Sequence, residues 1–244
     1  MSDGRVYRRL AAIVAVDVAG YSRLMGADEE GTLRRFQECR RELVNPKICE
    51  HRGRIVKTTG DGMLVEFGSV IDAVRCAVEV QRGMIDREAE WDDDRRIRFR
   101  VGINLGDIIV EDEDIFGDGV NIAARLEALA DPGGLCISGT VHDQISDRLG
   151  FPFRDMGEQI VKNIMRPVRA YQMSAATVAA TPPVATALAT PGPTDGREET
   201  KAAPRLSVVV LPLANLSADP QQEYFVDAIT DDVISGCRGS KGAL

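Results

Sequence analysis

Hydrophobic residues in the first half of the chain alternate between strand spacing and helix spacing. Residues 11–18 (AAIVAVDV) are apolar on both faces, which is typical of a central β-strand. Residues 28–50 repeat apolar side chains at helical spacing, and we expect this helix to bend or restart at Pro46 because proline removes a backbone donor. A further helix is predicted over about 70–88.

A β-hairpin is predicted between these helices, at residues 54–67 (RIVKTTGDGMLVEF). In its first strand Ile55, Lys57 and Thr59 alternate with Val56 and Thr58, as strand residues do. Glycine and aspartate at residues 60–62 then turn the chain, and a second apolar run follows. The hairpin thus carries a lysine on its first strand and a carboxylate at its tip.

The second half continues with strands and helices in alternation. Residues 96–111 (RIRFRVGINLGDIIVE) have strand alternation, and Gly106 is expected to bend the chain into a partner strand. The remaining predicted elements are a helix at 119–130, a strand at 135–138, a helix at 140–149, and strands at 152–157 and 167–173. The order β-α-β-β-α-β predicts an α+β fold with a ferredoxin-like core and extra C-terminal strands.

Composition divides the chain into three parts. The first part, residues 1–173, carries a continuous secondary-structure pattern over residues 9–173. Residues 174–204 are rich in Ala, Thr and Pro without an apolar period, which predicts an extended linker. Residues 205–244 contain one predicted strand and one predicted helix, too few to bury a core alone. We expect them to begin a second domain that is cut short, or to dock elsewhere.

Charge and cysteine content limit the functional classes. The net charge is −8, with 30 basic against 38 acidic residues, which argues against a nucleic-acid-binding surface. An acidic chain still binds a nucleotide where a metal ion supplies positive charge. The five cysteines show no CxxC spacing and are expected to be free thiols. The N-terminal apolar run is interrupted by Asp17, so neither a signal peptide nor a membrane span fits, and we expect a cytoplasmic protein.

Two carboxylates are candidates for a metal site. Taken alone, Asp17 at a strand end suits a capping role, and Asp61 suits turn chemistry. If the first strand is central and the hairpin lies beside it, the two side chains meet at neighbouring strand ends. Their repulsion would cost stability unless a divalent cation lies between them. Such a pair suits Mg²⁺ or Mn²⁺ shared with substrate phosphates.

A second polar group lies on the helix predicted over 119–130. Asn121 and Arg125 are four residues apart and therefore share one helix face, opposite the apolar residues. A solvated polar face explains a lone arginine. Arg125, however, opposes the helix dipole near its positive end, which suggests an anionic target.

Three motifs together resemble the class III nucleotidyl cyclase catalytic domain. AVDVAGYSRLM, IVKTTGDGMLVEF and DIFGDGVNIAARLE occur in the family's order and spacing, and VKNIMRPVRAYQM (161–173) is similar to its closing strands. The resemblance covers about residues 9–173 and implies an adenylate cyclase acting in signal transduction. Its reaction is the conversion of ATP to 3′,5′-cyclic AMP and pyrophosphate. The segment SVVVLPLANLSADPQQEYFVDAITDDVI resembles the start of a TolB-like segment, which implies a sensor or partner-binding region beyond this chain.

The resemblance also implies the assembly of the site. Asp17 and Asp61, with the Val18 carbonyl, would bind two Mg²⁺ or Mn²⁺ ions from one subunit. The residues that hold the nucleotide would come from the other subunit. The family thus implies a C2 homodimer with two shared active sites.

The nucleotide-binding residues follow from the same resemblance. Lys57 would donate to a ring nitrogen of adenine, and Asp114 would accept from its exocyclic amine. Asn121 would orient the ribose, Arg125 would contact the reacting phosphate, and Lys162 lies near the family's terminal-phosphate lysine. Guanylyl cyclases carry Glu and Cys at the two base-reading positions, so Lys57 and Asp114 favour ATP.

Three alternatives remain open from the sequence. A guanylate cyclase is the nearest. A nucleotide-binding regulatory module that keeps the fold without turnover is the second, although neither a metal aspartate nor Arg125 is missing. A diguanylate cyclase, which shares the core, would require a Gly-Gly-Asp/Glu-Glu-Phe hairpin, whereas this one has Thr59-Gly60-Asp61-Gly62.

Overall fold

The computed structural model describes residues 7–111, 114–160, 164 and 166–182. The strands are β1 (Tyr7–Val18), β2 (Arg54–Thr59), β3 (Gly62–Phe67), β4 (Phe99–Glu111), β5 (Asp114–Phe116), β6 (Leu135–Ser138), β7 (Arg154–Gln159) and β8 (Val168–Met173). The helices are α1 (Tyr21–Ala27), α2 (Glu29–Cys39), the π-helical turn η1 (Arg40–Val44), α3 (Asn45–Glu50), α4 (Val70–Arg87), α5 (Asp118–Leu129), α6 (Gly139–Leu149) and α7 (Ala175–Ala180).

One sheet organises the described residues, with the strand order β2-β3-β1-β4-β6-β8-β7. The first four strands of that order reproduce the ferredoxin-like arrangement, in which the first strand lies between the third and the fourth. β1 is antiparallel to both β3 and β4, and β6 is parallel to β4. The predicted α+β class and ferredoxin-like core with extra C-terminal strands are therefore confirmed.

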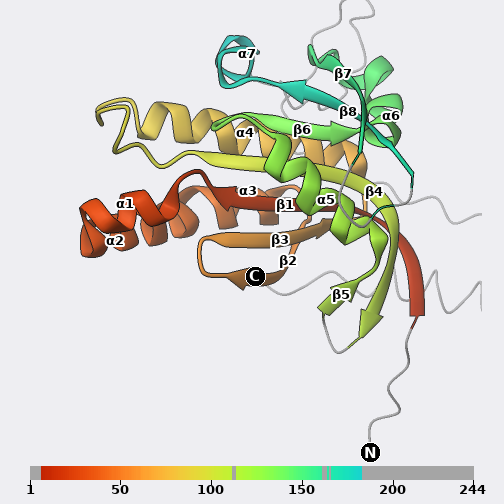
Figure 1. The fold of residues 1–244 in the computed structure, drawn as a ribbon, viewed down its shortest axis with the longest axis horizontal. Helices are drawn as coiled ribbons and strands as arrows, with labels where there is room; N and C mark the ends of the chain where they lie inside the picture. The colour runs from red at the N-terminus through yellow and green to blue at the C-terminus, as the bar shows by residue number, and fades with distance from the viewer. Residues whose placement is uncertain (1–6, 112–113, 161–163, 165, 183–244) are drawn as a thin grey trace, which may run out of the picture. The chain divides into compact units, whose positions relative to one another are not determined.

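Helices cover both faces of the sheet (Figure 1). The larger core places α2, α3, α4, α6 and α7 on one face, with buried residues such as Phe36, Val74 and Val141. On the other face α5 lies over the centre, where Ala123 packs among Ile13, Ile108 and neighbouring apolar residues. β5 extends from β4 as a short arm at the lower right of Figure 1.

The predicted helix over 28–50 is interrupted, as expected near Pro46. The interruption is the π-helical turn η1, which directly precedes α3, and the proline lies in the first turn of α3. Proline lacks the backbone donor that a continuous helix would use and clashes with the carbonyl four residues earlier, so the ladder widens there.

Two expectations about individual elements are wrong. β4 runs without a break from Phe99 to Glu111, so Gly106 does not end one strand and start another. The polypeptide turns only after Glu111, into β5. The predicted linker is also helical at its start, because α7 occupies its first residues and buries Val178 in the larger core. Residues 183–244, including the segment with the TolB-like resemblance, lie outside the described residues.

Candidate active site

Strand pairing brings the two candidate metal ligands together. Asp17 is the penultimate residue of β1, and in the neighbouring pair of strands Val16 lies opposite Met63 of β3. Asp61 is therefore at the hairpin tip beside the end of β1. The pKa of the Asp61 carboxyl is raised, first by burial and further by the negative charge of the nearby Asp17 carboxylate. The predicted convergence of two carboxylates at neighbouring strand ends is present in the structure.

A tight two-residue turn presents Asp61. Thr59 of β2 pairs with Gly62 of β3, so Gly60 and Asp61 are the two central residues. Gly60 has a φ of 61°, a left-handed conformation that glycine adopts without a steric cost and that hairpin turns of this length require. The turn chemistry expected from the sequence and the candidate ligand role therefore occur in the same residue pair.

Two charged residues that the sequence did not single out border this carboxylate pair. Arg100 of β4 lies directly opposite Asp17 in the strand register, and its Nη2 forms an ion pair with Asp17 Oδ2. On its other side the Arg100 Nε lies 3.0 Å from Oε1 of Glu127, on α5. In the sequence, Arg100 is marked only by its place at a polar position of the alternating run 96–111.

Glu127 is the most buried acid of this group, with 14% of its side chain exposed. Burial raises the pKa of its carboxyl to about 7, and the charges of Asp17 and Asp61 add to the rise, whereas Arg100 opposes it. Two carboxyl groups, Asp17 and Glu127, therefore pair with one guanidinium, and the charge of Asp61 acts on the same group.

This donor set suits a divalent cation. Aspartate oxygens are the ligands that Mg²⁺ and Mn²⁺ prefer. The pKa of Asp61 is raised first by burial and then by its interaction with Asp17, and a cation between the two carboxylates would relieve their repulsion. Val18 follows at the end of β1, with its side chain buried in the larger core. The part assigned to its carbonyl stays a prediction.

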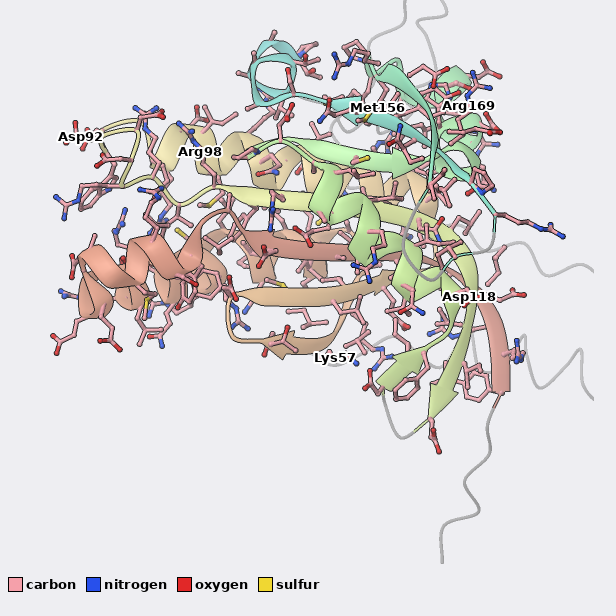
Figure 2. The ribbon with its side chains drawn as sticks, viewed as in Figure 1. Lys57, Asp92, Arg98, Asp118, Met156 and Arg169 are labelled. Carbon is pink, nitrogen blue, oxygen red and sulfur yellow. The ribbon has the colours of Figure 1, made fainter. Side chains whose placement is uncertain are left out.

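A β-bulge determines where Lys57 points. The register of β2 against β3 shifts between Ile55 and Lys57, so Val56 is an extra residue and Lys57 lies opposite Leu64. Leu64 belongs to the core on the α5 face, whereas Ile55 packs against the opposite core. Simple alternation would have put Lys57 on the same face as Ile55. The bulge instead turns it toward α5 and β5 (Figure 2).

Lys57 and Asp114 form a direct ion pair. The Lys57 Nζ lies 2.8 Å from Asp114 Oδ2, and the Phe116 ring lies 5.4 Å from the same ammonium. Asp114 Oδ1 also accepts a hydrogen bond from the backbone N–H of Ile115, at 2.7 Å. The hydrogen bond from Lys57 lowers the pKa of the Asp114 carboxyl, so this group stays a charged acceptor. The two predicted base-reading residues are thus held together, although they are 57 positions apart.

Asn121 and Arg125 lie one turn apart on α5, and both are exposed. Within the described part of the chain neither side chain forms a hydrogen bond or an ion pair, so both are free to contact another molecule. Their shared face was predicted from their spacing. Lys162 lies outside the described residues, and its assignment stays a prediction.

A different acidic group lies on the opposite face of the sheet. Ligand atoms of Glu50, His51 and Glu79 lie within 4.8 Å of one another. The Lys47 ammonium, however, lies 2.9 Å from Glu50 Oε2 and 2.7 Å from Glu79 Oε2. This cluster already contains a cation of its own, and we do not assign a metal to it.

Comparison with known families identifies the domain. Residues 11–175 match the model of the adenylate and guanylate cyclase catalytic domain. The chain belongs to this cyclase family. Residues 11–175 are therefore a cyclase catalytic domain.

Individual relatives agree with the family. The chain is 47% identical over 235 residues to "Putative adenylate cyclase 3" of Rhizobium meliloti, a match that covers 96% of this chain. It spans only 38% of that relative's length. An "Adenylate/Guanylate Cyclase/Hydrolase" structure from Silicibacter pomeroyi is 52% identical, with a TM-score of 0.67 over 70% of this chain and 99% of the other. The adenylyl cyclase CyaB from P. aeruginosa is 25% identical, with a TM-score of 0.62 over 69% and 95% of the two chains.

The described helices are also informative about membranes. None of those in the described ranges combines the length and the hydropathy needed to cross a bilayer.

Proposed function

We propose that this cyclase domain converts ATP to 3′,5′-cyclic AMP and pyrophosphate. The observation that carries the proposal is the Lys57–Asp114 pair, in which a cationic donor and an anionic acceptor lie 2.8 Å apart on one surface. Adenine presents a ring nitrogen that accepts and an exocyclic amine that donates. Guanine presents a carbonyl acceptor and a ring N–H donor instead, so its groups are mismatched with these two side chains. The 47% identical relative named as an adenylate cyclase supports the same choice.

The phosphate end of the substrate would lie at the hairpin tip. Asp17 and Asp61, with the Val18 carbonyl, would hold two Mg²⁺ or Mn²⁺ ions. Ions held there would supply Lewis-acid activation of the ribose 3′-hydroxyl that attacks the α-phosphorus, and would offset charge on the leaving pyrophosphate. By holding these ions, the two carboxylates would position the triphosphate in line with that hydroxyl, so their contribution is positioning as well as charge.

The free polar face of α5 would serve the reacting centre. Asn121 would orient the ribose, and Arg125 would stabilise negative charge that develops on the α-phosphate. Lys162 would contact the terminal phosphate. Asn121 and Arg125 have no partner within the described part of their own chain, which supports their use in a site completed by a second subunit. We therefore propose a homodimer with two shared sites.

The test is a product assay with ATP and with GTP, each with Mn²⁺, followed by exchange of the base-reading pair. The wild-type domain is expected to produce cyclic AMP from ATP with a higher kcat/KM than cyclic GMP from GTP. Lys57→Glu combined with Asp114→Cys, the residues of guanylyl cyclases, is expected to reverse that preference by roughly tenfold or more. The matched control, Lys47→Glu, changes the same charge on α3, away from the pair, and should keep the ATP preference.

Two results would contradict this assignment. A wild-type domain that turns over GTP as well as ATP would make it a guanylate cyclase or an unselective cyclase. A domain that binds ATP without forming a cyclic product, at any protein concentration, would make it a regulatory module of the same fold.

A further inference from the structure

Arg100 is held between two carboxylates that come from different elements. Its Nη2 pairs with Oδ2 of Asp17 on β1, and its Nε lies 3.0 Å from Oε1 of Glu127 on α5. The Arg100 side chain is 31% exposed, so the guanidinium reaches the surface at the carboxylate pair while its Nε is buried. A single cation thus bridges the end of β1 and helix α5.

The contact with Glu127 is close but incomplete. Neither Arg100 Nε nor Glu127 Oε1 makes a hydrogen bond, and both atoms are buried. The two atoms lie 3.0 Å apart but are not aligned for a hydrogen bond, so the pair lacks the additional stabilisation of a charge-assisted hydrogen bond. A small rotation of the Arg100 side chain would form this hydrogen bond, so Glu127 Oε1 can still accept one from Arg100.

Backbone packing fixes the position of Glu127. Gly102 follows Arg100 by two residues on β4 and therefore lies on the same face of the sheet. A Cβ at Gly102 would be 2.1 Å from the Glu127 backbone N and 2.2 Å from the Ala123 carbonyl O. The helix therefore lies directly on the strand, and Glu127 cannot retreat from Arg100.

Cation binding at Asp17 competes with this arrangement. Arg100 occupies Oδ2 of Asp17, an oxygen that a divalent ion held by Asp17 and Asp61 would use. The guanidinium would have to leave that oxygen. If it then had no carboxylate partner, a partly buried positive charge would be left unpaired, which costs free energy. Glu127 offers a partner within reach.

We propose that Glu127 is a positioning residue that receives the Arg100 guanidinium when a divalent cation takes Asp17. Arg100 then acts as an internal cation that the metal displaces, and Glu127 lowers the cost of displacement. This inference rests on the proposed metal role of Asp17 and Asp61. The quantity that it predicts is the affinity of the domain for the divalent cation when no nucleotide is present.

The experiment measures Mn²⁺ binding without nucleotide, from the electron paramagnetic resonance signal of free Mn²⁺ at fixed ionic strength. The pH is 8, above the pKa of about 7 that burial gives the Glu127 carboxyl, so that this group is ionised. Arg100→Met removes the competitor and is expected to tighten the Mn²⁺ dissociation constant. Glu127→Gln leaves Arg100 on Asp17 and is expected to weaken binding, in each case by roughly two- to tenfold, as for partly exposed ion pairs. Asp118→Asn, at the other end of α5, removes the same charge as a control and is expected to change the constant less than Glu127→Gln.

A double-mutant cycle separates this role from a general effect of charge. If Glu127 acts through Arg100, Glu127→Gln loses most of its effect when Arg100 is already Met. Equal weakening of Mn²⁺ binding in both backgrounds would show that the negative charge of Glu127 attracts the cation directly, without Arg100, and would overturn the proposal. So would an Arg100→Met domain that binds Mn²⁺ no more tightly than wild type. If Glu127→Gln fails to fold, Glu127→Asp, whose shorter side chain cannot reach Arg100 as closely, replaces it in the same cycle.

Asp17→Asn distinguishes this inference from the proposed function. It should abolish the Mn²⁺ binding on which both depend. Full Mn²⁺ binding in Asp17→Asn would refute the metal site itself. Loss of binding there, together with additive effects of Arg100 and Glu127, would refute only the displacement of Arg100.

Discussion

At the scale of single residues, burial next to like charges determines how Glu127 titrates. Its pKa is raised to about 7 from an ordinary value of 4.5, chiefly because the carboxylate is removed from water. The folded chain therefore binds this proton more tightly than the unfolded chain. The resulting stabilisation is fully present below pH 4.5 and is lost as the pH rises through about 7.

Replacing Glu127 by glutamine should remove this dependence, because the amide does not ionise. The free energy of unfolding of Glu127→Gln minus that of wild type should become more positive between pH 5 and pH 8, by about 1 to 2 kcal/mol, which allows for remaining solvent screening. Urea denaturation of both proteins with EDTA, at several pH values, measures this difference. A difference that is constant with pH would mean that Glu127 titrates in the folded domain as it does in water.

The sequence predicted the carboxylate pair but not its neighbours. Asp17 and Asp61 are predictable because a strand end and a hairpin tip are marked by local sequence. Arg100 and Glu127 lie within a strand and a helix, where a charged side chain is usually expected to face solvent. They meet only because the register of β1 with β4 and the packing of α5 place them together. Tertiary register is not encoded in any short window of the sequence.

At the scale of elements, the sequence predicted strands and helices better than their irregularities. The hairpin, α4, α5 and the closing strands were expected near their observed positions. The bulge before Lys57 was not, since Val56 fits either face of a strand. Gly106 does not bend the chain into a new strand, because a glycine within a strand also allows close approach by another backbone. Here a Cβ at Gly106 would be 3.1 Å from Gly119 Cα of α5.

Gly102 gives a test of the packing of α5 on β4. In Gly102→Ala the new methyl would meet the α5 backbone at 2.1 Å, and backbone cannot move aside as a flexible side chain does. We expect a loss of unfolding free energy of about 1–3 kcal/mol or more, with reduced cyclase activity because α5 carries Asn121 and Arg125.

Gly26→Ala is the matched control for that substitution. Nothing lies within 4 Å of its added Cβ, and the residue is in helix α1, where alanine is favoured. Thermal and urea unfolding should show this variant to be at least as stable as wild type. Equal stability of Gly102→Ala and wild type would contradict the close contact between helix and strand.

At the scale of the whole molecule, the two sets of candidate residues lie in one chain, and we propose that each set completes its site with the other set of a second copy. The carboxylate pair lies at the tip of the β2–β3 hairpin, and Lys57 lies back along β2, paired with Asp114 on β5. Asn121 and Arg125 are exposed on α5 without partners in the described ranges. The tip of the hairpin and its first strand thus carry residues of different sets, as a site shared between two subunits requires.

Mixing inactive variants tests this arrangement. Asp17→Ala and Lys57→Ala chains should each be inactive, but their heterodimer has one site with intact carboxylates from one chain and an intact base-reading pair from the other. Random exchange at equal amounts makes half of the dimers heterodimers, each with one of two sites, so about a quarter of wild-type activity should return. A mixture of Asp17→Ala with Asp61→Ala damages the metal ligands of both chains and should stay inactive. With one partner of each mixture labelled with ¹⁵N, native mass spectrometry establishes that heterodimers form in both mixtures. If they form and the first mixture is as inactive as the second, each site is built within a single chain and the shared-site arrangement is wrong.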